Sequence, residues 1–239
     1  MREFSNESID LIYLDPPYYT NRNFKNNNYK FSDKWKNIDA YLEFMEVRLT
    51  ETHRILRSTG SIYLQADWRV IFDLKPIMDS IFGRDNFKND IVWSYNSGGS
   101  SKKTKFAKKH DTILFYTKSD TSTFNTQRIP YECGISKKHK HNFHKDGKRM
   151  GDSWNDIHTL STTARERTGY PTQKPIALLD RIITVSSNLG DIVLDPFCGS
   201  GTALKSAQNL GRQYIGIDEN IYAVEVSNKR LRHGLSNFY

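Results

Sequence analysis

The sequence predicts an α/β fold built on a doubly wound, mostly parallel sheet. Two observations predict it: short apolar runs alternate with stretches of helical periodicity, and two of those runs end abruptly at an Asp-Pro dipeptide. The length of 239 residues suits one large domain that carries an insertion. The predicted strands are residues 11–14, 61–66, 88–95, 112–117, 192–195 and 213–217, and the predicted helices are residues 38–56, 70–82, 176–187, 203–210 and 222–231.

The first strand is apolar throughout and stops at a stiff tetrapeptide formed by Asp15, Pro16, Pro17 and Tyr18. Proline cannot continue a ladder, and the residue before each proline is held extended. At the carboxyl end of a parallel strand, where open α/β sheets bind ligands, this stretch presents a carboxylate, carbonyl oxygens and a flat ring. That set suits a planar base with an exocyclic amino group. The alternative is an ordinary strand followed by a proline-rich turn.

The segments after this strand alternate between helix and strand. Residues 19–34 are polar and predict a mobile loop, placed where it could act as a lid or grip a nucleic-acid strand, or simply cover the surface. Gly60 is expected to end the helix that begins at residue 38. The next strand ends near Asp67, and Pro76 marks a candidate kink in the helix that follows.

The middle of the chain carries the excess charge. Between Lys102 and Arg149 there are 13 Lys and Arg and 4 Asp and Glu, whereas the whole chain has a net charge of +8. A near-neutral scaffold with a basic middle predicts a nucleic-acid contact surface. Residues 119–168 lose periodicity, so we expect a recognition insert there and a catalytic domain formed by 1–118 and 169–239. The lysines expected to contact nucleic acid are Lys102, Lys103, Lys105, Lys108, Lys109, Lys137, Lys138 and Lys140.

The second Asp-Pro run leads through a glycine turn into a helix, a geometry that lets backbone approach a ligand closely. Asp218 ends the next strand, where an acid typically accepts hydrogen bonds from ribose hydroxyls. Thr202 rather than lysine follows Gly201, and Leu204 stands where a dinucleotide fingerprint needs glycine. Asp195 repels phosphate and attracts a cationic ligand. S-adenosylmethionine fits, because it carries a sulfonium and an α-amino group and no phosphate. The alternative is a purely structural strand-turn-helix corner.

Taken together, the two runs resemble the DNA amino-methyltransferases that modify adenine N6 or cytosine N4. The order, with the catalytic motif first and the cofactor motif last, resembles their β group, a permuted form of the Rossmann-like methyltransferase fold. The similarity covers roughly residues 8–118 and 169–235. Further matching motifs are Phe31-Ser32-Asp33-Lys34-Trp35, Gly60-Ser61-Ile62-Tyr63-Leu64, His110-Asp111-Thr112-Ile113-Leu114-Phe115 and Thr172-Gln173-Lys174-Pro175.

The resemblance implies a role for each matching residue. Asp15 and the carbonyl of Pro16, followed by Pro17 in the same motif, would accept from the target amino group, and Tyr18 would stack on the flipped base. Such hydrogen bonds stabilise the positive charge that develops on the nitrogen. The implied contacts to S-adenosyl-L-methionine are Thr172, Gln173 and Lys174 near its carboxylate, Asp195, Pro196, Phe197, Gly199 and Gly201 around its methionine and sulfonium, and Asp218 at its ribose.

One departure from the family pattern concerns the start of the chain. Family members usually carry a strand and an acidic Gly-Asp-x-Leu segment ahead of the catalytic strand, whereas eight residues precede Ile9. We therefore expect the leading strand to be missing and the strand over 213–217 to lie at a sheet edge.

Asp at position 15 favours adenine N6 among the targets of this family. Cytosine N4 is an alternative that shares the chemistry. A truncated, inactive DNA-binding remnant is a second alternative, and RNA is a further candidate substrate. The resemblance also implies double-stranded DNA as the partner and a restriction endonuclease beside it.

Composition argues against several other classes of protein. Cys133, His139, His141 and His144 lack the paired spacing of zinc ligands, so no metal site is predicted. Cys133 and Cys198 are the two cysteines of the chain, which gives no disulfide framework and suits a reducing cytoplasm. No apolar run reaches 18 residues, and the amino terminus lacks the core of a signal peptide.

Overall fold

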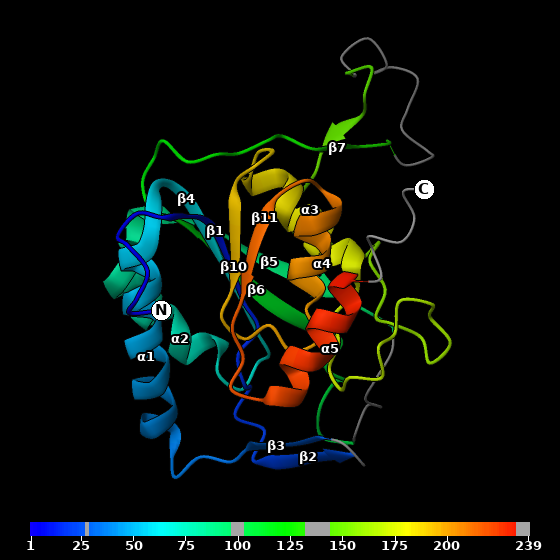
Figure 1. The fold of residues 1–239 in the computed structure, drawn as a ribbon. Helices are drawn as coiled ribbons and strands as arrows, with labels where there is room; N and C mark the ends of the chain where they lie inside the picture. The colour runs from blue at the N-terminus through cyan, green and yellow to red at the C-terminus, as the bar shows by residue number, and fades with distance from the viewer. Residues whose placement is uncertain (27–28, 97–102, 132–143, 233–239) are drawn as a thin grey trace.

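A seven-stranded sheet forms the centre of the molecule in the computed structural model, which describes residues 1–26, 29–96, 103–131 and 144–232 (Figure 1). The strand order is β11-β10-β1-β4-β6-β5-β9, and β6 alone runs against its neighbours in this sheet. The predicted mostly parallel α/β sheet is confirmed. Its strands are β1 (Ile9–Leu14), β4 (Leu56–Ala66), β5 (Phe87–Ser94), β6 (His110–Thr117), β9 (Ser153–Trp154), β10 (Ile192–Asp195) and β11 (Gln213–Gly216).

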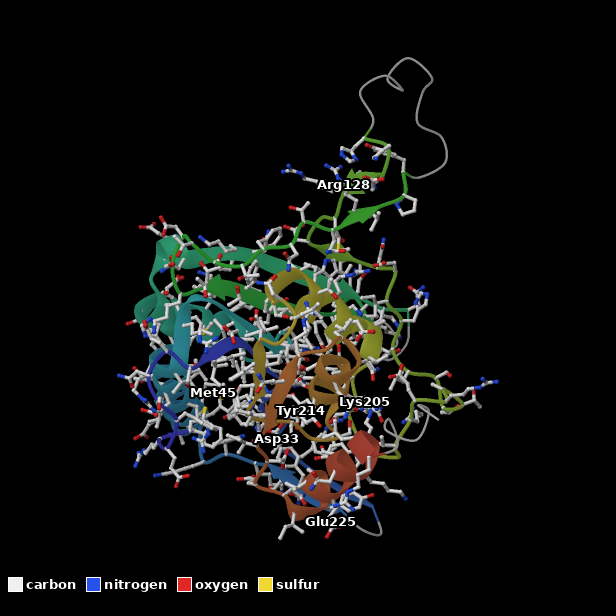
Figure 2. All side chains as sticks on the ribbon, turned by 45° about the horizontal axis from the view of Figure 1, so that its top comes forward. Asp33, Met45, Arg128, Lys205, Tyr214 and Glu225 are labelled. Carbon is white, nitrogen blue, oxygen red and sulfur yellow. The ribbon has the colours of Figure 1, made fainter. Side chains whose placement is uncertain are left out.

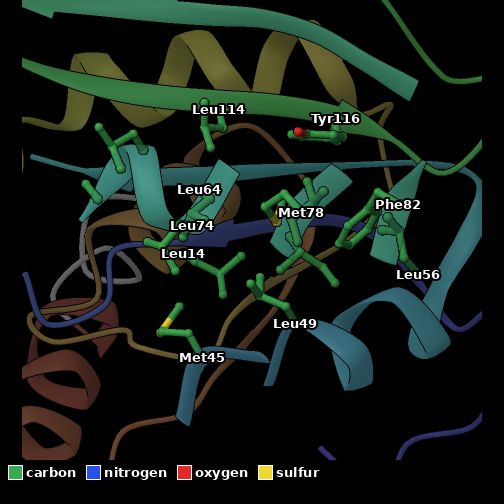
Figure 3. Packing of buried hydrophobic residues seen from close by; sticks show 14 of the residues in the cluster. Leu14, Met45, Leu49, Leu56, Leu64, Leu74, Met78, Phe82, Leu114 and Tyr116 are labelled. Atoms are coloured by element: carbon green, nitrogen blue, oxygen red, sulfur yellow. The ribbon is translucent and has the colours of Figure 1, made fainter. Parts of the chain in front are cut away.

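Helices cover both faces of this sheet. On β1, Ile12 and Leu14 pack toward α1 and α2, whereas Leu11 and Tyr13 pack toward α3 and α4. Figure 3 shows the first of these two cores, where leucine and methionine side chains fill the space between sheet and helices. The helices are α1 (Ile38–Ile55), α2 (Ile71–Phe82), α3 (Ile176–Ser186), α4 (Thr202–Asn209) and α5 (Ile221–Arg232), with a short 3₁₀ turn at Arg84–Asn86.

Residues 19–34, predicted to be a polar loop, contain regular secondary structure. They contain an antiparallel hairpin of β2 (Arg22–Asn26) and β3 (Tyr29–Asp33), seen at the bottom of Figure 1. Phe24 lies opposite Phe31, with 6.0 Å between their ring centroids. The prediction of a loop was wrong because polarity alone does not exclude a hairpin, and a cross-strand aromatic pair such as this one stabilises strand pairing.

Gly60 does not end a helix. Helix α1 ends at Ile55, and β4 begins at the next residue and contains Gly60. A Cβ at this position would lie 2.6 Å from Cδ1 of Leu56, so glycine leaves room for that buried leucine. Helix α2 continues across Pro76 without interruption.

The predicted insert at 119–168 contributes to two different parts of the structure. Its β9 strand joins the main sheet, and the Nε1 of Trp93 donates to the carbonyl oxygen of Ile157 at 2.8 Å. The pair β7 (Arg128–Ile129) and β8 (Lys148–Arg149) instead projects from the body, at the opposite end from β2 and β3 (Figures 1 and 2). The predicted contacts Lys102, Lys137, Lys138 and Lys140 lie outside the described residues, as do Cys133, His139 and His141.

Strand β11 lies at one edge of the described sheet and pairs with β10, as expected for residues 213–217. No helix in the described part of the chain has the length and apolarity needed to cross a membrane.

Candidate active site

Strand ends from both halves of the chain meet at one cavity of about 490 Å³. Asp15, Asp67 and Asp218 follow β1, β4 and β11, Asp195 ends β10, and Asp111 enters from the start of the reversed strand β6. The acidic residues that line the cavity are Asp15, Asp33, Asp67, Asp111, Asp195, Asp218 and Glu219, and Lys174 is the one lysine or arginine among the described lining residues. This charge balance favours a cationic ligand and disfavours phosphate.

Asp15 receives hydrogen bonds on both carboxylate oxygens. The Tyr18 hydroxyl donates to Oδ1 at 2.6 Å, and the Lys174 ammonium lies 2.5 Å from Oδ2. The Tyr41 hydroxyl donates to the Pro17 carbonyl at 2.8 Å, which fixes the stretch after the strand. Burial, followed by the charge of Asp15, raises the pKa of Tyr18 well above its usual value, so Tyr18 remains a donor at neutral pH.

Asp195 lies deeper, with 3% of its surface exposed. Its Oδ1 accepts from the Phe197 backbone N–H at 3.0 Å. Burial raises its pKa well above the usual range, and the nearby Asp15 and Asp218 charges act in the same direction. A cation bound in this cavity would favour the charged carboxylate and lower that pKa.

The glycine turn after β10 links the cofactor strand to its neighbour. Gly199 has a φ of +48°, and its N–H donates to Oδ2 of Asp218 at 2.9 Å. Gly201 has a φ of +70°, and a Cβ there would lie 2.8 Å from Oγ of Ser227. Burial raises the pKa of Cys198 to about 12, so this thiol is protonated at neutral pH and packs as a small side chain.

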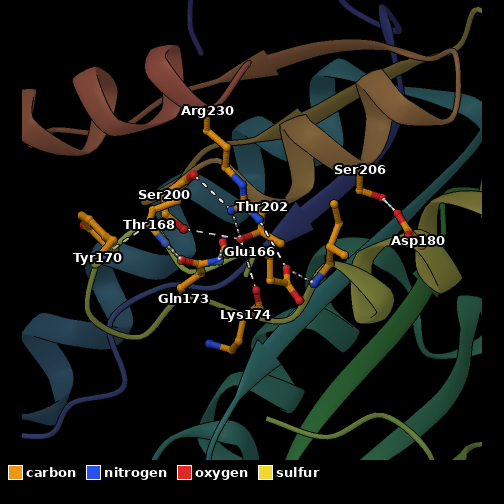
Figure 4. A network of polar contacts seen from close by, with 11 residues as sticks. Glu166, Thr168, Tyr170, Gln173, Lys174, Asp180, Ser200, Thr202, Ser206 and Arg230 are labelled. Atoms are coloured by element: carbon orange, nitrogen blue, oxygen red, sulfur yellow. Dashed lines mark hydrogen bonds and ion pairs between the residues drawn. The ribbon is translucent and has the colours of Figure 1, made fainter. Parts of the chain in front are cut away.

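The segment before α3 is held by a polar network (Figure 4). Oε1 of Gln173 accepts from the N–H and the hydroxyl of Thr168, both at 2.8 Å, and its Nε2 donates to the Glu166 carbonyl at 2.8 Å. The Thr202 hydroxyl donates to the Lys174 carbonyl at 3.3 Å. Gln173 therefore ties together the loop that carries Lys174, and the Lys174 side chain is left to reach Asp15.

The structure brings most of the predicted site residues together. Asp15 and Lys174 are in contact although 159 positions separate them in the sequence. Gly201 and the described lysines Lys103, Lys105, Lys108 and Lys109 do not line the cavity. The predicted residues that do line it are Asp15, Pro16, Pro17, Tyr18, Thr172, Gln173, Lys174, Asp195, Pro196, Phe197, Gly199 and Asp218.

A second hydrogen-bonded chain beside the cavity was missed at the level of sequence. The Tyr13 hydroxyl donates to Oε1 of Gln65 at 2.7 Å, and Nε2 of Gln65 donates to Asp111 at 3.0 Å. The Tyr95 hydroxyl donates to the other oxygen of Asp111 at 3.1 Å. Burial raises the pKa of Asp111. Asp111 belongs to the motif His110-Asp111-Thr112-Ile113-Leu114-Phe115 at the start of its strand, which is a sequence signal, whereas Gln65 gave none.

In the part of the chain that the structure describes, no three His, Cys, Asp or Glu side chains gather as ligands for a metal ion. His144, from the cluster considered for zinc, has its Nδ1 3.5 Å from a carboxylate oxygen of Asp146.

Comparisons with known proteins agree with this geometry. The model of a family described as DNA methylase, covering N6 and N4 enzymes, matches residues 9–229. The Type II methyltransferase M.HpaI of Haemophilus parainfluenzae is 35% identical over 239 residues, which span all of this chain and 73% of the relative. The DNA adenine methyltransferase YhdJ of Escherichia coli (strain K12) is 33% identical over 97% of this chain and 79% of its own length.

Among solved structures, the complex of M1.HpyAVI with SAM has a similar fold. The TM-score is 0.66 at 21% sequence identity, over 96% of this chain and 90% of the other. At this identity the likeness concerns the fold.

Proposed function

Because the chain belongs to the family of N6 and N4 DNA methylases, we propose that it transfers a methyl group from S-adenosyl-L-methionine to N6 of adenine in double-stranded DNA. The observation that carries the proposal is the placement of Asp15 and Asp195 at the ends of neighbouring parallel strands, facing one acidic cavity. One carboxylate can serve the target base and the other the cofactor. Adenine is supported by Asp at position 15 and by the name of the Escherichia coli relative.

The acidic lining of the cavity suits the charge of the cofactor. S-adenosylmethionine supplies a methyl group on a cationic sulfur, and the lining residues offer seven carboxylates against one lysine. Asp195, Phe197 and Gly199 would hold the methionine and sulfonium end. Asp218, oriented by the Gly199 N–H, would accept from the ribose hydroxyls.

Asp15 would stabilise the positive charge that develops on the target nitrogen during methyl transfer. Its Oδ2 already accepts from an amino nitrogen, that of Lys174, so the target amino group would take the place of this donor. The Pro16 carbonyl would accept the second N–H. As the C–N bond forms and the C–S bond breaks, these oxygens stabilise the positive charge on N6, and one N6 proton then departs to solvent. Tyr18 would stack on the base.

The test is methyl transfer to duplexes in which either adenine or cytosine is the one base that can accept a methyl on its amino group. We expect labelled methyl to enter the adenine duplex, with no transfer by Asp15→Ala and full transfer by Asp120→Asn, which removes an exposed carboxylate outside the cavity. Transfer to cytosine alone would favour the N4 alternative. DNA binding without cofactor binding would favour a DNA-binding remnant.

We also propose a restriction endonuclease of the same sequence specificity as a functional partner, and a cytoplasmic location, where bacterial DNA lies. The name of M.HpaI as a Type II methyltransferase supports the pairing. DNA methylated by this chain should resist cleavage by such an enzyme, and cleavage of fully methylated DNA would contradict the pairing.

A further inference from the structure

An exposed aromatic and basic surface lies beside the cavity, and neither the chemistry above nor the core uses it. We call this surface the aromatic–basic rim. Phe106 is 93% exposed, more than any other large apolar side chain among the described residues, and Trp68 is 43% exposed. The rim consists of Trp68, Arg69, Lys105, Phe106 and Lys108.

Two chain segments connect the rim to residues that line the cavity. Trp68 directly follows Asp67, which lines the cavity after β4. The loop that carries Phe106 leaves β5 at Tyr95 and returns to β6 just before Asp111, and both of these residues also line the cavity. The Tyr95 N–H donates to the Lys109 carbonyl at 2.9 Å, which closes the base of this loop.

The cations of the rim gather around one indole ring. Nζ of Lys108 lies 4.9 Å from the Trp68 ring centroid, and Nζ of Lys105 lies 5.9 Å from it. Cζ of Arg69 lies 5.1 Å from the same ring, and Arg69 is also paired with Asp67. These cation–π contacts hold the loop over Trp68. Phe106, between the two lysines in the sequence, is left almost fully exposed.

A partner for this rim must satisfy both kinds of side chain. Lysine and arginine side chains bind an anionic surface, and an exposed phenylalanine ring stacks on a flat apolar face. An acidic protein surface is anionic but offers no regular flat apolar face. DNA meets both, because phosphates flank stacked bases at regular spacing.

We propose that Phe106 inserts into the DNA base stack next to the target nucleotide, while Lys105 and Lys108 bind the flanking phosphates. The insertion fills the space that the target base leaves when it rotates into the cavity. This inference rests on the proposed function, since a base must leave the duplex to reach Asp15. It makes Phe106 a positioning residue, because it acts on the DNA and not on the reacting atoms.

The test separates opening of the duplex from methyl transfer. The duplex carries the sequence that the wild-type chain methylates in plasmid DNA, and it is prepared in two forms, one fully paired and one with an abasic site opposite the target adenine. Unpairing is already complete in the abasic form. Phe106→Ala should therefore lower kcat/KM by about tenfold or more on the paired duplex and by less than about threefold on the abasic duplex.

Two variants complete the experiment. Phe106→Trp should retain activity on the paired duplex, because it keeps a flat ring at the same place. Leu189→Ala removes an apolar side chain that is 79% exposed and lies outside the rim and the cavity. This variant should leave kcat/KM unchanged on both duplexes. A 2-aminopurine in place of the target adenine should brighten with the wild-type chain and much less with Phe106→Ala.

The outcomes distinguish this inference from the proposed function. Equal losses on both duplexes, or no loss on either, would overturn the insertion while methyl transfer by the wild-type chain stands. Absence of methyl transfer to any DNA by the wild-type chain would overturn the proposed function and the inference with it.

Discussion

Asp15 and Asp195 belong to two regions built from the same start, a buried parallel strand followed by Asp-Pro. Their strands β1 and β10 are direct neighbours, with Leu11 opposite Val193 and Ile12 opposite Leu194. The regions differ after the dipeptide. Pro17 keeps the first chain extended, whereas the glycines of the second turn the chain back into α4.

The different continuations give the two carboxylates different electrostatics. The Asp15 side chain is 18% exposed and receives hydrogen bonds from the Tyr18 hydroxyl and the Lys174 ammonium. Asp195 is 3% exposed and receives one from the Phe197 backbone N–H. A partly exposed acceptor suits a substrate that arrives and leaves, and a buried carboxylate suits a cation that must be held. The comparison teaches that the residues after the dipeptide, and not the aspartate itself, decide the role.

The largest expected effect falls on the first carboxylate. Asp15→Asn should lower kcat for methyl transfer by about 1,000-fold, because an amide stabilises positive charge on the target nitrogen far less than a carboxylate does. The dissociation constant for S-adenosylmethionine, measured by calorimetry, should stay within about threefold of wild type. Asp120→Asn is the control for loss of a surface charge. A large loss of cofactor affinity would contradict the assignment of Asp15 to the target base and Asp195 to the cofactor.

The second carboxylate should show the reverse pattern. Asp195→Asn should weaken cofactor binding by about 30-fold, the size expected for one hydrogen bond to a charged group, and should leave kcat at saturating cofactor within about threefold. Initial rates over a cofactor series measure both quantities. A loss confined to kcat would place Asp195 with the target base and undo the comparison.

Because the pKa of Asp195 is raised, both the stability of the protein and its affinity for the cofactor should depend on pH. A carboxyl whose pKa is raised on folding contributes stability that is present below its unfolded pKa and is lost as pH rises through the folded value. The cofactor-free protein should therefore gain stability as pH falls through that raised range. A cationic cofactor needs the charged carboxylate, so its binding should release a proton and tighten with rising pH by at most about tenfold per unit.

Calorimetry in two buffers of different ionisation enthalpy measures this proton release. Asp195→Asn should abolish the Asp195 contribution, and Asp15→Asn should leave most of it. Proton release that is unchanged in Asp195→Asn would assign the effect to another buried carboxyl, with Asp111 first to examine.

Much of this site could be predicted from the sequence because a short local pattern marks the end of a strand. An apolar run that stops at Asp-Pro indicates both where the strand ends and which side chain lies there, so the positions of Asp15 and Asp195 at the carboxyl ends of their strands could be predicted. Their sharing of one cavity follows from parallel strands ending at one edge. Asp67 carries the same signal in weaker form, because it follows a buried strand but no proline comes after it, whereas Asp111 lies at the start of β6.

The remainder depended on contacts that no local pattern encodes. The pairing of Lys174 with Asp15 arises when the loop before α3 packs beside β1, 159 positions away in the sequence. Gln173 carries a motif that suggests a ligand contact, yet its amide is occupied by Thr168 and Glu166. The hairpin at 22–33 was missed because its one aromatic pair lies among asparagines.

The smallest predicted effect concerns the turns that set the two regions apart. Gly201→Ala should lower the free energy of unfolding by about 2 kcal/mol, because a φ of +70° strains alanine and the added Cβ would meet Ser227. Pro17→Ala should cost about 0.5–1 kcal/mol, chiefly through greater freedom of the unfolded chain. Urea unfolding of both variants measures the difference. Equal losses would show that the backbone conformation of the second turn is no more demanding than that of the first.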